Sequence, residues 1–119
     1  MAIRGVRGAT VAEADQPELV LAATRQLLEA MLHDNPAMQP CDICSAFFTL
    51  TEDLRSVYPA AAAREMGWNQ VPLLCAQEIP VPGSLPRCIR ILLHWNTDLA
   101  QEAVHHVYLG QATCLRPDI

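Results

Sequence analysis

Apolar residues recur along the chain with two different periods, and each period predicts one kind of element. Over residues 17–33 they fall at steps of three and four, the spacing of one face of an α-helix. Pro17 suits a first helical turn, and Asp15 with Glu18 has the spacing of a capping box. The helix is expected to end before Pro36, because the residue before a proline disfavours helical geometry. This pattern predicts one long amphipathic helix that packs against a sheet.

Shorter β-prone runs, bounded by glycine, proline and asparagine, predict the strands of that sheet. An alanine-rich run over residues 59–66, stopped by Gly67, predicts a short helix between two of them. The strands are expected at residues 2–11, 45–51, 71–78, 87–96, 105–109 and 112–115. One long helix against about five strands predicts an α+β fold, and 119 residues predict a single domain over residues 1–119.

The expected strand at residues 87–96 is apolar on both faces, which a single helix cannot cover. Alternation puts one set on one face, Ile89, Ile91, Leu93 and Trp95. It puts the other set on the opposite face, Cys88, Arg90, Leu92 and His94. Packing against further copies of the chain is the simplest way to bury the second face, and the apolar share of 51% favours it. Arg90 would then point into a cleft between subunits.

Composition narrows the class of protein. A net charge of −5 argues against a nucleic-acid partner, and no apolar run approaches the roughly 20 residues that span a bilayer. Five cysteines, an odd number, without a secretory leader favour reduced thiols in the cytoplasm. All eight basic residues are arginine, which a GC-rich genome explains by itself, although arginine is also well suited to bidentate binding of carboxylates.

Motifs for covalent, phosphoryl-transfer or hydride chemistry are missing from the sequence. Cys41 and Cys44 have metal-ligand spacing but no second pair, so ordinary thiols are favoured over a metal site. His105 and His106 are neighbours on an expected strand and would point to opposite faces. We therefore expect neither a metal nor a cofactor.

Arginines within otherwise apolar strands are the remaining candidates for chemistry. A charge in such a strand is costly unless it is paired or hydrated, so each residue alone is more often a solvated rim residue. Three such arginines together favour an anion site, and they are Arg7, Arg87 and Arg90. Further candidates at or near strand positions are Cys75, Glu78 and Tyr108.

Short motifs follow one another in a distinctive order over nearly the whole chain. They are Ile3-Arg-Gly-Val-Arg-Gly-Ala-Thr10, Thr51-Glu-Asp-Leu54, Val71-Pro72 with Cys75 and Gln77-Glu78, Gly83, Cys88-Ile-Arg90, Asn96-Thr-Asp98, His106-Val-Tyr-Leu109 and Leu115-Arg-Pro-Asp118. In this order the chain resembles the small trimeric chorismate mutases, which are unrelated to the all-helical class. The resemblance implies a mixed sheet with one long helix, a homotrimer that forms a pseudo-α/β barrel, and active sites in clefts between subunits.

The resemblance also implies a reaction. The family converts chorismate to prephenate, a step toward phenylalanine and tyrosine, by a Claisen rearrangement. One carbon–oxygen bond breaks while a carbon–carbon bond forms, and no covalent intermediate or cofactor is needed. A sequence without a nucleophile or metal motif agrees with this.

Carried over by position, five residues would hold the substrate from one subunit. Arg90 would donate to the ether oxygen and to a carboxylate. Arg7 would bind the side-chain carboxylate together with Tyr108. Glu78 would accept from the ring hydroxyl, and Cys75 would lie at the same hydroxyl.

The adjacent subunit would contribute Tyr58 and Arg64 near the ring carboxylate. Leu74 stands where relatives have a cleft threonine, and Ala61 where some have a lysine, so Arg64 would do more of the carboxylate binding. The closing C-terminal segment would add two more residues, Leu115 and Arg116.

Two other functions stay open at this stage. Imine deaminases are also trimers with an arginine in an inter-subunit cleft, but they lack the Leu-Arg-Pro-Asp ending and the pair formed by Arg7 and Arg90. A catalytically inactive trimer that binds a small acid is the second alternative. The presence of Arg7, Arg90, Glu78 and Tyr108 together argues against it.

Overall fold

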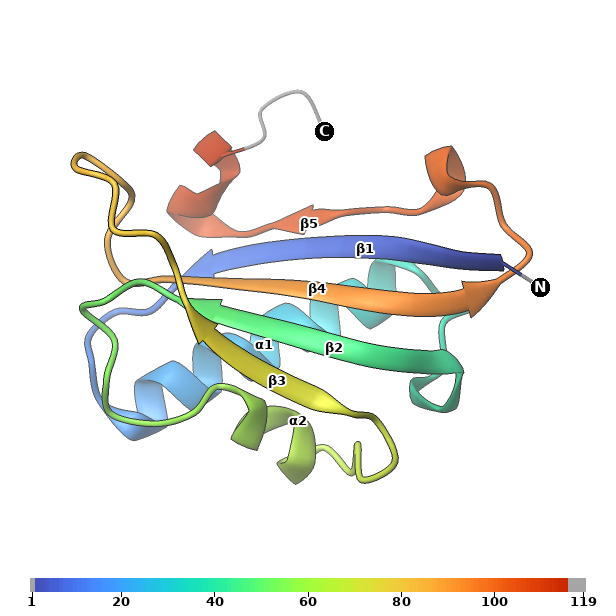
Figure 1. Ribbon diagram of the computed structural model, residues 1–119, viewed down its shortest axis with the longest axis horizontal. Coiled ribbons are helices and arrows are strands. Elements are labelled where there is room, and N and C mark those ends of the chain that lie inside the picture. Colours follow the sequence, from blue (N-terminus) through green and yellow to red (C-terminus); the bar gives the residue numbers. More distant parts are fainter. Residues whose placement is uncertain (1, 116–119) are drawn as a thin grey trace.

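Strand β4 (Cys88–Thr97) lies at the centre of a five-stranded sheet in the computed structural model, which describes residues 2–115 (Figure 1). The strand order is β3-β2-β4-β1-β5. The other strands are β1 (Ala2–Val11), β2 (Ile43–Leu50), β3 (Leu73–Gln77) and β5 (Val107–Tyr108). β4 is antiparallel to β1 and β2, whereas β3 and β5 run parallel to their neighbours. The sheet is mixed, as expected.

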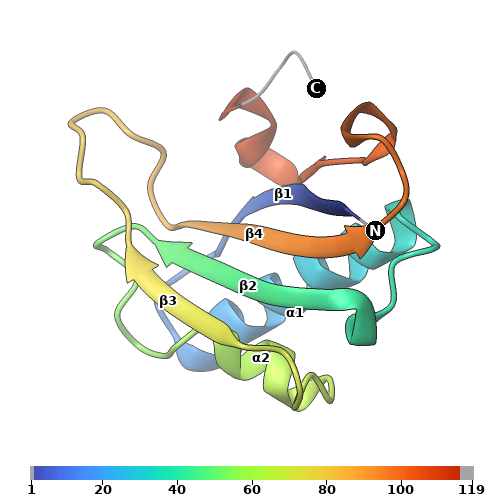
Figure 2. The same cartoon turned by 45° about the vertical axis from the view of Figure 1, so that its right-hand side comes forward.

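The helices cover one side of this sheet only. The long helix α1 (Pro17–Asp34) and the short helix α2 (Ala60–Glu65) both lie on the same side (Figures 1 and 2). The described part of the chain also contains short 3-10 helices at Pro40–Asp42, Gln101–Ala103 and Gly110–Leu115. The predicted α+β fold with one long and one short helix is confirmed. No helix within residues 2–115 combines the length and the apolarity needed to cross a membrane.

The core forms between α1 and the helix-facing side chains of the central strands. Leu27, Leu28 and Met31 of α1 are fully buried there. The alternation expected for β4 is confirmed from Ile89 onward, because one predicted set faces the helices and is buried, namely Ile89, Ile91, Leu93 and Trp95. At the start of the strand Cys88, from the other set, is buried as well. On the other face Arg90, Leu92 and His94 are only half-buried.

The uncovered face of the sheet carries apolar side chains in the open. Ile3 is 58% exposed, Phe47 is 44% exposed and Leu74 is 59% exposed. Leu74, Phe47 and Leu92 are cross-strand neighbours on this face. A single chain therefore leaves an apolar surface exposed, as the two-faced pattern predicted.

The expected capping box at the start of α1 is wrong. Gln16 is the N-cap residue, and no side chain caps the helix. The Asp15 carboxylate instead accepts hydrogen bonds from the backbone N–H groups of Arg55 and Ser56, both at 3.0 Å. The Asp15 carboxylate, which the local spacing predicted as a helix cap, therefore binds a loop that is distant in sequence.

The expected final strands are wrong in part. Only Val107–Tyr108 pairs with β1, because the main chain at His105 is bonded to the side chain of Asn35 instead. Residues 112–115 belong to a 3-10 helix. Gly110 has a φ of 56°, a left-handed conformation that turns the chain away from the sheet edge.

Gly8 of β1 lies directly against side chains of α1, with no room for a side chain of its own. A Cβ atom on Gly8 would lie 2.6 Å from Sδ of Met31 and 3.1 Å from Cδ1 of Leu27. Gly8→Ala should therefore lower the free energy of unfolding by about 1–3 kcal/mol, the usual scale of overpacking. Chemical denaturation measures this. The same substitution should cost less in a Met31→Ala background, and an equal cost in both backgrounds would show that the close approach is not the cause.

Candidate active site

A pocket of about 250 Å³ opens on the uncovered face of the sheet, where β1, β2, β4 and β5 meet. Three of the predicted site residues line it, Arg7, Arg90 and Tyr108. Strand register explains the grouping, since Ala9 pairs with Arg90 on one side and with Tyr108 on the other. Ala9 lines the pocket between Arg90 and Tyr108, and its small side chain leaves space there. The remaining lining residues are Gly8, Phe47, Thr49, Ile91 and Leu92.

The charges around this pocket are predominantly positive. Nε of Arg90 lies 3.4 Å from Oε2 of Glu78, and the side chains are 42% and 21% exposed. Arg7 adds a second guanidinium, and its backbone N–H donates to Nδ1 of His106 at 3.0 Å, which ties β1 to the segment that carries Tyr108. Two guanidinium groups, one carboxylate and a phenol in otherwise apolar surroundings suit an organic dianion.

Glu78 reaches this group from just beyond the end of β3. Its backbone N–H donates to the carbonyl oxygen of Leu50 at 2.8 Å, which continues the pairing with β2 by one residue. Its carboxylate accepts a hydrogen bond from the hydroxyl of Thr49. Thr49 was missed by the sequence reasoning, although a hydroxyl within the apolar run of β2 was a signal that could have singled it out.

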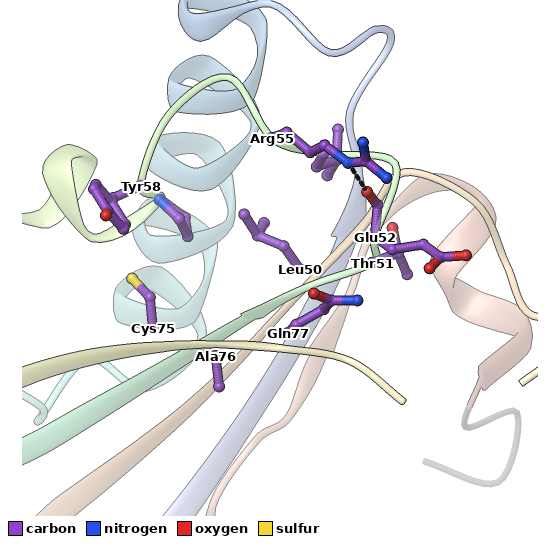
Figure 3. A pocket seen from close by; sticks show the side chains of 10 residues that line it. Leu50, Thr51, Glu52, Arg55, Tyr58, Cys75, Ala76 and Gln77 are labelled. Atoms are coloured by element: carbon purple, nitrogen blue, oxygen red, sulfur yellow. Dashed lines mark hydrogen bonds between the residues drawn. The ribbon is translucent and has the colours of Figure 1, made fainter. Parts of the chain in front are cut away.

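A second pocket of about 420 Å³ lies at the β3 edge, on the helix side of the sheet (Figure 3). Tyr58 and Cys75 lie near each other at one end of it, and Arg55 and Glu52 lie at the other. Successive side chains of β3 alternate, so Cys75 faces away from the side that carries Leu74. Within one chain the structure therefore places Cys75 with Tyr58 and apart from Arg7, Arg90 and Tyr108.

Comparison with known proteins decides the family. A family model described as chorismate mutase type I matches residues 3–119. The chain belongs to the type I chorismate mutase family. It is 53% identical to the chorismate mutase AroH of Thermus thermophilus over 117 residues, 98% of this chain and 96% of that protein. It is 44% identical to the AroH of Bacillus subtilis over 120 residues, 100% of this chain and 94% of that protein.

A solved structure agrees. A chorismate mutase from Clostridium thermocellum superposes with a TM-score of 0.90 at 43% identity, over 92% of this chain and 97% of that one. The expectation of a chorismate mutase, rather than an imine-deaminase-like protein, is confirmed for family and activity.

The other predicted residues of this chorismate mutase are spread over the surface. Leu74 lies on the uncovered face beside Phe47. Arg64 is exposed in the last turn of α2 and Ala61 is half-buried in the same helix. Leu115 ends the last 3-10 helix and is half-buried, whereas Arg116 lies outside the described residues.

Arg87 does not belong to the anion site that was expected for it. It precedes β4 with a φ of 51°, and its Nε donates to the carbonyl oxygen of Ala12 at 3.0 Å. Its backbone N–H donates to the carboxylate of Asp53, with distances of 3.1 and 2.9 Å to the two oxygens. Arg87 therefore anchors the entry to β4, and two arginines rather than three face the pocket.

The cysteines carry no sign of a metal site. Sγ of Cys44 donates to the carbonyl oxygen of His94 at 3.1 Å, and Cys41 is exposed. Within residues 2–115 no three histidine, cysteine, aspartate or glutamate side chains gather as metal ligands would.

Cys88 is buried two residues before Arg90. Burial raises the pKa of its thiol, and the nearby Arg90 guanidinium offsets part of that rise, so the thiol stays neutral at physiological pH.

The loop that carries Tyr58 depends on Asp15. Hydrogen bonds from the Ser56 side chain and from the N–H groups of Arg55 and Ser56 hold the pKa of Asp15 below its ordinary value of 3.8. A lowered folded-state pKa stabilises the fold above the unfolded-state pKa, and this stabilisation is lost as the pH falls through the folded-state pKa. Asp15→Ala should therefore lower the thermal midpoint at neutral pH and make residues 52–58 easier to cleave with protease.

That difference between wild type and Asp15→Ala should shrink as the pH falls well below 3.8. The matched control is Glu13→Ala, which removes an exposed carboxylate two residues away. A difference that persists unchanged in acid would mean that the ionised carboxylate is not what holds the loop.

Proposed function

We propose that this enzyme, acting as a single domain over residues 1–119, converts chorismate to prephenate in the pocket between Arg7, Arg90 and Tyr108. The observation that carries the proposal is the convergence of two guanidinium groups and a phenol on an apolar hollow. Chorismate has two carboxylates, a ring hydroxyl and a breaking ether bond, and each needs a partner of this kind. A binding protein without activity would not need a donor aimed at the ether oxygen.

The pocket performs two physical tasks in this mechanism. It holds the flexible enolpyruvyl arm over the ring, because Arg7 and Tyr108 bind the side-chain carboxylate; orientation of this kind can supply up to about 7–11 kcal/mol. It also places a fixed positive charge where negative charge grows on the ether oxygen. Arg90 does this, and Glu78 accepts from the ring hydroxyl.

The site is completed by a second copy of the chain. One chain leaves Ile3, Phe47 and Leu74 exposed on the face that carries the pocket. We infer a homotrimer in which these faces meet, so that Tyr58 and Arg64 of one subunit close the cleft of the next. Tyr58 is 73% exposed, which suits a residue that acts on a neighbour. All five cysteines are free thiols, which fits work in a reducing cytoplasm.

Arg90→Ala should lower kcat/KM for chorismate by about 10²–10³, the usual cost of removing one donor to a developing oxyanion. Arg90→Lys should also be poor, because a point charge cannot reproduce the planar guanidinium fork. The loss of chorismate absorbance measures both. Arg25→Ala is the matched control, since Arg25 is exposed on α1 and pairs with Glu29 at 3.3 Å.

Two results would contradict this role of Arg90. One is a near wild-type rate for Arg90→Lys. The other is an equal collapse of thermal stability and activity in Arg90→Ala, because the reason for Arg90 is charge and not packing.

A homotrimer predicts a definite mass in solution. Light scattering should give three times the subunit mass of 13.1 kDa, about 39 kDa.

A shared cleft also predicts complementation between inactive variants. Arg90→Ala and the double variant Tyr58→Ala/Arg64→Ala should each be impaired alone. After co-expression, mixed trimers contain some clefts with all three residues intact, so activity should partly return. A fully active monomer, or no recovery in mixed trimers, would place the whole site within one subunit.

A further inference from the structure

Thr49 lies between the two charged groups at the edge of the pocket. It is opposite Arg90 in the β2–β4 ladder and opposite Ala76 in β3, two residues before Glu78. Its hydroxyl donates to Oε2 of Glu78, and Nε of Arg90 lies 3.4 Å from the same oxygen. Oε2 therefore joins the hydroxyl to the guanidinium, and neither contact uses Oε1.

The Arg90 guanidinium lies beside the Glu78 carboxylate and also interacts with the buried Cys88 thiol. Its Nε is buried and has no well-aligned hydrogen-bond partner among the described residues, so the contact with Glu78 is its charged support. Glu78 follows the end of β3, and its carboxylate sits on a long side chain with several rotatable bonds. The position of Nε of Arg90 therefore depends on where the Glu78 carboxylate is held.

Threonine is a suitable residue to restrain that carboxylate. Its branched Cβ limits the rotation of χ1, and β2 is paired on both sides, so its hydroxyl is held by rigid backbone. Thr49 also lines the same pocket as Arg7, Arg90 and Tyr108.

We propose that Thr49 is a positioning residue for the reaction: its hydroxyl holds the Glu78 carboxylate against Nε of Arg90 and so directs the terminal nitrogens of Arg90 into the pocket. This rests on the proposed function. With Nε and Oε2 engaged, the two Nη groups of Arg90 serve the ether oxygen and a carboxylate, and Oε1 of Glu78 serves the ring hydroxyl.

Thr49→Val tests the hydroxyl with almost no change in shape or strand propensity. We expect kcat for chorismate to fall about tenfold, the scale of one hydrogen bond to a charged group, while KM changes much less. The thermal midpoint should stay near that of the wild type. Thr49→Ser keeps the hydroxyl and should recover most of kcat. Thr97→Val is the matched control, because Thr97 lies at the far end of β4, opposite Ala2.

A double-mutant cycle tests whether Thr49 acts through Glu78. In a Glu78→Ala background the hydroxyl has no carboxylate to hold, so Thr49→Val should cause almost no further loss of kcat. A second variant, Thr49→Ala, removes the hydroxyl without adding an apolar branch. It should lose kcat as Thr49→Val does.

Each remaining outcome overturns something specific. Four results would each reject the role of Thr49 and leave the proposed function intact. Two concern single variants: a wild-type kcat in Thr49→Val, or a loss in Thr49→Ser as large as in Thr49→Val. The other two are a loss of kcat in Thr49→Val that Thr49→Ala does not share, and losses that are additive with Glu78→Ala. A wild type that does not consume chorismate would reject the proposed function, and the role of Thr49 with it.

Discussion

The two helices α1 and α2 can cover only one face of the sheet, and the other features of the structure depend on this constraint. The 18-residue helix α1 and the short helix α2 bury the inward side chains of the central strands. The outward face of the sheet also carries apolar side chains, and a single chain leaves Ile3 of β1, Phe47 of β2 and Leu74 of β3 exposed. In the proposed homotrimer, contact between copies of the chain would remove this apolar area from water, which is the main driving force for association.

The same constraint explains how arginines are tolerated within apolar strands. Arg7 and Arg90 lie on neighbouring strands and on the uncovered face, where each can reach water or an anionic ligand. Ala9 separates Arg90 from Tyr108 along one row of the sheet. Closure of the cleft by another subunit would exclude water, and interactions between the guanidinium groups and a dianion become stronger as the effective dielectric constant falls.

The two parts of the proposed site differ in rigidity. Arg7, Thr49, Arg90 and Tyr108 project from paired strands, which hold catalytic geometry more accurately than loops do. Tyr58 projects from a loop that is held by long-range bonds to Asp15. This division suits a mechanism in which one subunit holds the reacting atoms and the neighbour closes over them.

Periodicity along the sequence was enough to determine the long helix and the central strands with their faces. The four-residue steps of α1 and the alternation in β4 are local properties of the chain. They correctly predicted that Leu27 and Met31 share a buried stripe and that Arg90 lies on the face of β4 opposite Ile91. The order of motifs was enough to determine the family.

Contacts between distant segments decided what local pattern could not. Asp15 has the spacing of a helix cap, yet it binds a loop 40 residues away along the chain. Arg87 belongs to the same apolar run as Arg90, but a left-handed turn and the carboxylate of Asp53 remove it from the pocket. The contact between Thr49 and Glu78 joins residues 29 positions apart, and only the pairing of β2 with both β3 and β4 brings them to Arg90. Sequence spacing specifies periodicity within an element, whereas strand register, which depends on the packing of the whole chain, determines which side chains meet across the sheet.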